Sequence, residues 1–355
     1  MDVEEIKLLQ ECLLTTRNFV AFRFPNERII RIIKSEEAIQ VQKIEDLQNH
    51  SSSFVFAPFS TKNNPIIVLQ SDDYKEIKLD IKQDFSKNRK SCSMIEKSVS
   101  PSYVSDFQRF HTGVKQQFQK LVLARTEEVK KSPDAVQLFL EACQTHSNAM
   151  VYLFKSEETG VWLGATPEIL LEGTKGEMHT IALAGTMRKN APDAQLQWSE
   201  KNRQEQAIVT DYLRKRIQKF SRIDAENGPY TYGNSRLAHL RTDLYFRVSP
   251  EDIFKVINEL HPTPAVCGIP KEEAIDFILN NESEPRTYYA GFLGWYEPQK
   301  ETRLYVNLRC MRWIDTQTVQ LMAGGGILPE STLEQEWKET EAKMETLRGL
   351  EAFNV

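Results

Sequence analysis

Residues 323–343 read AGGGILPESTLEQEWKETEAK, a glycine run that leads into a segment with helical periodicity. Glu336, Glu339 and Lys343 recur at spacings of three and four residues, which places them on one face of a helix. Glycine runs are useful where backbone must approach another group closely. The stretch therefore predicts a site that offers backbone amides, carboxylates and an ammonium group to one small acidic ligand.

The start and the buried face of this helix are also marked in the sequence. Ser331 followed by Glu334 fits a capping box, in which each side chain satisfies a backbone N–H of the first turn. Trp337, Met344 and Leu347 recur at helical spacing and predict the buried stripe. A solvated face with lysine–glutamate pairs is the alternative to a binding role.

The rest of the chain predicts an α+β fold. Apolar and polar patterns predict helices at 4–15, 104–119, after Ser132-Pro133, and at 199–220. They predict strands at 19–24, 65–69, 120–126, 150–154, 161–165, 172–187, 288–295, 303–313 and 318–323. Consecutive hairpins with helices between them favour two large, mostly antiparallel sheets packed as a layered sandwich with helices around them. Since no linker is evident, we expect one structural domain.

Composition excludes several classes of protein. The 355 residues are 27% charged and 40% hydrophobic, with a net charge of -5, so we expect no nucleic-acid partner. No apolar window approaches a membrane span and the N-terminus lacks a basic leader, which favours a cytoplasmic protein. Five scattered cysteines without a C-x-x-C pair argue against disulfides and zinc. Walker A, G-x-G-x-x-G and G-x-S-x-G motifs are also missing.

Four charged residues are candidates for chemistry. Lys120 opens an apolar strand, and burial would favour its neutral, basic form, although a lysine at a strand end commonly reaches solvent. Glu168 follows Pro167, which restricts the turn and would hold the carboxylate rigidly. Glu205 lies near the buried edge of its helix, and with Glu339 it could bind a hard divalent cation.

These candidates lie in motifs that resemble the chorismate-utilising enzymes, a family with isochorismate, salicylate, anthranilate and aminodeoxychorismate synthases. The resemblance covers about residues 97–355. Its motifs are QKLVLAR (119–125), GATPE (164–168), LAGT (183–186), K-x-R-x-E (201–205), HPTPAVCG (261–268), YAG (289–291), Arg309, GGGI (324–327) and EWKETEAK (336–343). Residues 1–95 would then be the variable N-terminal part of the fold, and 96–355 the chorismate-binding catalytic core.

The resemblance implies Mg²⁺ as the cofactor and chorismate as the substrate. Glu205 and Glu339 would bind the metal directly and Glu336 through water. The implied substrate-binding residues supply oriented amides, guanidinium, ammonium and hydroxyl groups for the substrate's carboxylates. They are Thr186, His239, Tyr289, Arg309, Gly324, Gly326 and Lys343.

The residue at position 120 indicates the reaction. Family members that add ammonia resemble one another in carrying glutamine there, whereas those that add water carry lysine, which activates water for attack at ring C2. Glu168 would be the acid that protonates the departing C4 hydroxyl. The aminodeoxychorismate branch has a lysine where this chain has Ala184. The resemblance therefore implies an isochorismate synthase that supplies menaquinone or a catechol siderophore.

Two alternatives and one departure accompany this interpretation. A salicylate synthase would also eliminate pyruvate, and a non-catalytic chorismate-binding subunit would lack the reaction. Gln206 stands where the family usually has histidine after the metal glutamate. Its amide could replace that histidine if the role is to support the helix, whereas metal affinity could fall if the role is to orient Glu205. We expect a monomer, or at most a weak homodimer.

Overall fold

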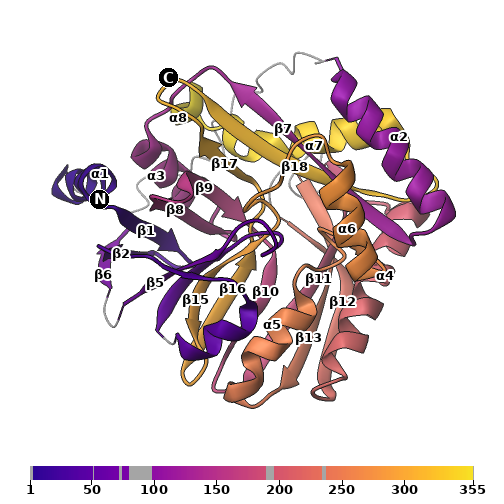
Figure 1. Ribbon diagram of the computed structural model, residues 1–355, viewed down its shortest axis with the longest axis horizontal. Coiled ribbons are helices and arrows are strands. Elements are labelled where there is room, and N and C mark those ends of the chain that lie inside the picture. Colours follow the sequence, from indigo (N-terminus) through magenta and orange to yellow (C-terminus); the bar gives the residue numbers. More distant parts are fainter. Residues whose placement is uncertain are drawn as a thin grey trace.

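The chain folds around two large sheets, as a computed structural model shows (Figure 1). The structure describes residues 3–50, 52–71, 74–79, 98–188, 196–233 and 237–354. Strands from the first 95 residues enter both sheets and pair there with strands from later in the chain. The N- and C-terminal ends lie on the same side of the molecule in Figure 1.

The first sheet contains nine strands among the described residues and is antiparallel throughout its pairings. Its strands, in spatial order, are β14 (Gly268–Ile269), β7 (Lys120–Val129), β18 (Val319–Ile327), β17 (Cys310–Trp313), β9 (Gly160–Thr166), β8 (Met150–Ser156), β1 (Asn18–Arg23), β2 (Ile29–Ser35) and β6 (Lys75–Lys78). The sheet thus places β7 directly beside β18, although about 200 residues separate them in the chain.

The second sheet also contains nine strands in the described part of the chain. In spatial order these are β12 (Ile223–Tyr232), β13 (Leu237–Arg247), β11 (Glu177–Arg188), β10 (Ile169–Thr174), β16 (Glu301–Val306), β15 (Phe292–Glu297), β4 (Ser53–Ala57), β5 (Ile66–Gln70) and β3 (Ile39–Val41). All of its pairings are antiparallel too. The expected fold class is confirmed.

Helices surround the sheets. They are α1 (Val3–Thr15), η1 (Ile44–Asn49), α2 (Pro101–Gln116), α3 (Ala135–Thr145), α4 (Glu200–Ile217), η3 (Pro250–Asp252), α5 (Ile253–Leu260), α6 (Lys271–Asn281), α7 (Leu333–Arg348) and α8 (Glu351–Asn354). Among the described residues, none of these helices is long and apolar enough to cross a membrane. Helix α4 packs on β11 and β13, and α7 packs on β18, so these two helices bring their side chains to the strands of the site.

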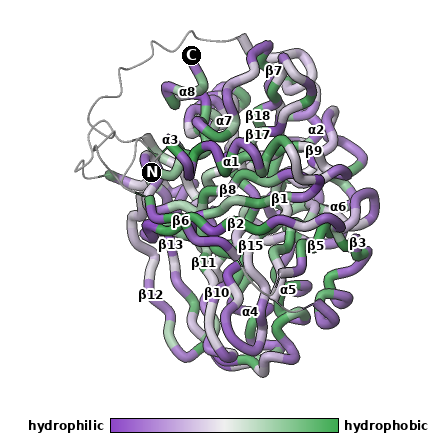
Figure 2. The backbone as a smooth tube through the Cα atoms, turned by 90° about the vertical axis from the view of Figure 1, so that its left-hand side faces the viewer, coloured by the Kyte–Doolittle hydropathy of each residue, from purple (hydrophilic) through white to green (hydrophobic). Residues whose placement is uncertain are grey.

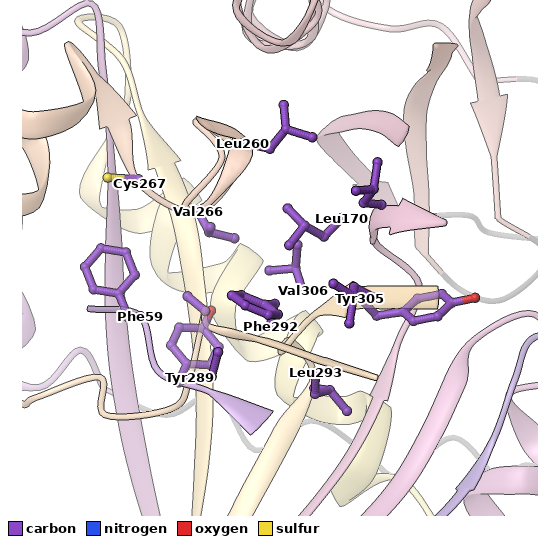
Figure 3. Packing of buried hydrophobic residues seen from close by; sticks show 14 of the residues in the cluster. Phe59, Leu170, Leu260, Val266, Cys267, Tyr289, Phe292, Leu293, Tyr305 and Val306 are labelled. Carbon is purple, nitrogen blue, oxygen red and sulfur yellow. The ribbon is translucent and has the colours of Figure 1, made fainter. Parts of the chain in front are cut away.

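Between the sheets lies a core rich in aromatic residues. Phe56 of the second sheet stacks on Phe154 of the first, with ring centroids 4.3 Å apart. Another part of the core contains Tyr289, Val266 and Phe292 (Figure 3). Hydrophobic stretches lie mainly in strands near the middle of the molecule (Figure 2). Since Tyr289 and Val266 also line the cavity described below, the core holds one wall of the site in place.

Three local predictions need correction. The predicted capping box is wrong: α7 has Thr332 as its N-cap, without a side-chain cap bond, and the Ser331 hydroxyl accepts from the Leu328 N–H instead. The strand predicted at 318–323 extends through the glycine run, because β18 continues to Ile327. The strand predicted at 303–313 is two strands, because Arg309 adopts a left-handed backbone with φ of 50° between them.

Candidate active site

The glycine strand presents two residues to the site through their backbone groups. Gly324 lies opposite Ala124 of β7, but the Ala124 N–H donates to Glu282 Oε1 (2.7 Å) rather than to β18. Gly326 lies opposite Val122, whose N–H likewise bonds away from β18. In an antiparallel pair such residues turn their own N–H and C=O groups to the other side. The amides of Gly324 and Gly326 therefore face away from β7, beyond the end of β17.

A small cavity adjoins this strand. Its lining contains every predicted site residue except Lys120 and Glu336, each of which contacts a neighbouring carboxylate or lysine of the site. The free volume is about 50 Å³, enough for a few water molecules. Ligand pockets for small molecules measure several hundred Å³. Binding a substrate thus requires side chains to move.

Lys120 lies at the start of β7 with no exposed surface. The Lys120 Nζ atom is 2.9 Å from Glu205 Oε1, an ion-pair contact, although no acceptor in the described part of the chain is aligned with it for a hydrogen bond. Of the two alternatives that the sequence left open for Lys120, burial of the side chain is the one that the structure shows, and the side chain does not reach solvent. Glu205 comes from α4 and brings its carboxylate against the bare backbone of Gly326.

Two further carboxylates on α7 each contact a lysine. Glu336 pairs with Lys201 of α4, and Glu339 Oε1 accepts from Lys343 Nζ at 2.7 Å. Burial, followed by the neighbouring Glu339 carboxylate, raises the pKa of Glu336 to about 7. Burial alone would also raise the pKa of Glu339, but Lys343 and then Lys201 act in the opposite direction, and the pKa lies below its ordinary value. Lys343 also donates to the Gly324 carbonyl at 2.7 Å.

Glu168 is buried in the turn between β9 and β10. Burial raises its pKa to about 7, although the positive charges of Lys120, Lys343 and Arg309 oppose the rise. The Thr263 hydroxyl donates to Glu168 Oε1 across 3.5 Å, a long contact. A carboxyl group with a pKa near 7 can carry a proton at neutral pH and release it to a substrate.

Arg309 and His239 form a fixed pair at one wall. The Arg309 Nη2 atom donates to His239 Nε2 (3.1 Å), and the other ring nitrogen lies 3.1 Å from the Gly185 carbonyl. Burial, together with Arg309 and Lys343, lowers the pKa of His239 to about 3, so its imidazole is neutral. The neutral ring with Nδ1–H donating to Gly185 can accept from Arg309 and hold the guanidinium in place.

The remaining predicted substrate-binding residues lie close by. Thr186 Oγ1 is 3.4 Å from His239 Nδ1. The Tyr289 hydroxyl approaches Gly324 so closely that a Cβ there would be 3.1 Å from it. Burial raises the pKa of Tyr289, which keeps its hydroxyl protonated as a hydrogen-bond donor.

The side chains of Glu205, Glu336 and Glu339 are of the chemical type that a hard metal ion binds. Carboxylate oxygens are the ligands that Mg²⁺ prefers. Glu336 Oε2 is buried and has no hydrogen-bond partner in the part of the chain that the structure describes, and a Cβ on Gly325 would be 3.0 Å from it and 3.9 Å from Glu339 Oε1. Among the described residues, however, no three acidic, histidine or cysteine side chains converge around one point. The three carboxylate groups that could bind a metal are thus present, and each contacts a lysine side chain.

Gln206 links α4 to the second sheet. Its amide donates to Thr210 Oγ1 (2.9 Å) and to Thr242 Oγ1 (2.6 Å). The first bond lies within α4 and the second joins α4 to β13, and neither involves Glu205. Of the two roles considered for this position, the geometry favours support of the helix.

The sequence did not indicate several members of the site. Thr263 lies in the HPTPAVCG motif, and its position between two prolines was the available signal. The apolar part of the lining comes from residues inside strands and in loops, which strand periodicity alone does not distinguish from core. These residues are Val122, Leu183, Ala265, Val266, Leu308 and Ala323. Cys92, one of the five cysteines, lies outside the described residues, and the other four are buried free thiols.

The family described as chorismate binding enzyme matches residues 33–350. The chain belongs to the chorismate-binding enzyme family. Isochorismate synthase EntC of Escherichia coli (strain K12) is 32% identical over 197 residues, which are 53% of this chain and 50% of that protein. Isochorismate synthase MenF of the same organism is 31% identical over 240 residues, 65% of this chain and 55% of MenF. The match thus spans little more than half the length of these curated relatives.

Solved structures show the same fold. DhbC from Bacillus anthracis superposes with a TM-score of 0.76 at 22% identity, over 98% of this chain and 99% of that one. MenF from Escherichia coli gives a TM-score of 0.75 at 20% identity, over 96% and 90% of the two chains. These solved structures therefore share the fold of this chain.

Proposed function

We propose that this chorismate-binding enzyme is an isochorismate synthase, which converts chorismate to isochorismate with Mg²⁺ as its cofactor. The observation that carries the proposal is the joint placement of Lys120 and Glu168. Both are buried beside one cavity, and the Lys120 charge acts on the Glu168 carboxylate. The named relatives with about 30% identity, which are isochorismate synthases, support the same reaction.

In the proposed reaction, Lys120 acts in its neutral form, and its amine takes a proton from a water molecule that adds to C2 of the ring. The ring double bonds shift, and the C4 hydroxyl takes the proton of Glu168 and leaves as water. One water enters and one leaves, so the overall change is an isomerisation. A base and an acid at separate ring positions are what this displacement requires.

Binding would depend on groups with charge opposite to the two carboxylates of chorismate. Arg309, held by neutral His239, and Lys343 supply positive charge. The amides at Gly324 and Gly326 add donors that face the cavity. Mg²⁺ would neutralise the ring carboxylate when bound by Glu205 and Glu339, with Glu336 acting through water.

Product analysis tests this proposal. Purified protein would be incubated with chorismate and Mg²⁺, and the products separated by chromatography, with Lys120→Gln as a matched control. Isochorismate as the sole product supports the proposal. Salicylate with pyruvate would instead indicate a salicylate synthase, and unchanged chorismate would contradict both enzymes.

A further inference from the structure

The three carboxylates proposed to hold the metal, those of Glu205, Glu336 and Glu339, each contact a lysine. Glu205 pairs with Lys120 of β7, Glu336 with Lys201 of α4, and Glu339 with Lys343 of its own helix. A buried carboxylate without a counter-charge is costly, so these contacts stabilise the cluster when no metal ion is bound. A divalent cation at the same oxygens would be repelled by the ammonium groups. At least one lysine side chain must then move away from its carboxylate partner.

Lys201 is the lysine that is able to move. Lys120 has no exposed surface, and Lys343 is held by both the Gly324 carbonyl and Glu339. The Lys201 side chain keeps 20% of its surface exposed. In addition, Lys201 interacts with all three carboxylates, with Glu336 the nearest.

A second cavity provides the space for this movement. It has a volume of about 330 Å³, opens to the surface, and shares Thr186 and Glu339 with the catalytic cavity. Lys201 lines it, next to the polar side chains of Ser199 and Asn202. An ammonium group that swings into this cavity stays solvated, because its stem is flexible and polar groups and water are available.

We propose that Lys201 is the internal counter-ion of the carboxylate cluster and that Mg²⁺ binding displaces its side chain into the second cavity. The proposal rests on the metal site proposed above. It makes Lys201 a positioning residue for Glu336 in the metal-free protein and a competitor of the metal.

Lysine labelling of the full-length protein tests the displacement directly. The protein would be acetylated with and without saturating Mg²⁺, and the rate at each lysine read by peptide mass spectrometry. We expect Lys201 to react at least about fivefold faster with Mg²⁺, because its ammonium then lies in the open cavity. Lys62, which is exposed, should react at the same rate in both samples. An unchanged Lys201 rate, with or without calorimetric evidence of Mg²⁺ binding, would overturn the proposal.

A neutral replacement tests the competition. Lys201→Met should tighten Mg²⁺ binding in calorimetry by at least about tenfold, or about 1.4 kcal/mol. Lys338→Met is the matched control, since Lys338 also lines the second cavity but pairs with Glu334 instead. Its Mg²⁺ affinity should equal that of the wild type. Weaker or equal Mg²⁺ binding by Lys201→Met would show that Lys201 does not compete with the metal.

These measurements do not depend on turnover. If the wild-type protein leaves chorismate unchanged while Lys201 labelling responds to Mg²⁺, the proposed activity fails and the counter-ion role stands. If isochorismate forms but the acetylation rate of Lys201 does not change with Mg²⁺, the activity stands and the counter-ion role fails.

Discussion

Replacing Gly326 with alanine should disable the site by moving one carboxylate. A Cβ at this position would be 2.2 Å from Glu205 Oε1 and 3.0 Å from Lys120 Cε. Ordinary van der Waals contact begins near 3.4 Å, so the Glu205 carboxylate must move by about 1.2 Å. A misplacement of about 1 Å in an active site can reduce the rate about 100-fold. We expect kcat/KM for isochorismate formation to fall by about that factor, with a higher Mg²⁺ requirement.

The effect on folding should be smaller than the effect on activity. Overpacking of this kind costs about 1–3 kcal/mol, so Gly326→Ala should still fold and keep its circular dichroism spectrum. Gly325→Ala is the matched control on the same strand, because its Cβ would meet only the end of the Glu336 side chain at 3.0 Å and Glu339 Oε1 at 3.9 Å. It should lose less than about tenfold in kcat/KM. Wild-type kcat/KM and Mg²⁺ dependence in folded Gly326→Ala would refute the reasoning.

Three further predictions concern the base, the acid and the fold. Lys120→Gln should abolish water addition while the circular dichroism spectrum stays native, and wild-type turnover by this variant would exclude the lysine as base. Because burial raises the pKa of Glu168 to about 7, the protonated acid is lost above that pH, so kcat/KM should fall as pH rises through 7. Glu168→Gln should remove this limb of the pH profile and lower turnover by about 10²- to 10⁴-fold, whereas a pH profile that keeps the limb would assign it to another group. Arg286→Met should lower the free energy of unfolding by about 3–5 kcal/mol in denaturant titrations, because it removes the counter-charge of the buried Glu282 carboxylate. The control Arg222→Met, at an exposed side chain, should change it by no more than about 0.5 kcal/mol, and equal effects of the two variants would contradict this account.

Local patterns predicted elements well where the chain pairs with its own neighbour. The hairpin of β8 and β9 was visible because two apolar stretches are separated by a short turn before Gly160, which adopts φ of 73°. The pairing of β7 with β18 was not visible, since nothing in either segment specifies a partner about 200 residues away. The glycine run was also misplaced for a physical reason. Glycine disfavours a strand in isolation, but here the missing side chains leave room for Glu205 on one face and Glu336 on the other.

The site could be predicted as a set of residues but not as an electrostatic arrangement. Spacing on a helix shows that Glu339 and Lys343 are neighbours, and the structure has that pair at 2.7 Å. No spacing rule connects Lys201 of α4 with Glu336 of α7, because their contact depends on how two helices pack against the sheets. The pKa of Glu168 likewise depends on burial by segments that are distant in sequence. The pairings of Glu205 with Lys120 and of Glu336 with Lys201 therefore emerge only from the tertiary structure.

The register of β7 against β18 sets the position of Lys120 relative to the glycine residues of the site. Leu121 pairs with Ile327 and Val122 with Gly326, so Lys120 lies one position from the pair that ends the glycine strand. A slip of one residue in this ladder would turn Lys120 to the other face of the sheet. The proposed base and the backbone groups of the glycine strand are therefore positioned by a single pair of strands, and a change in that register should impair binding and chemistry together.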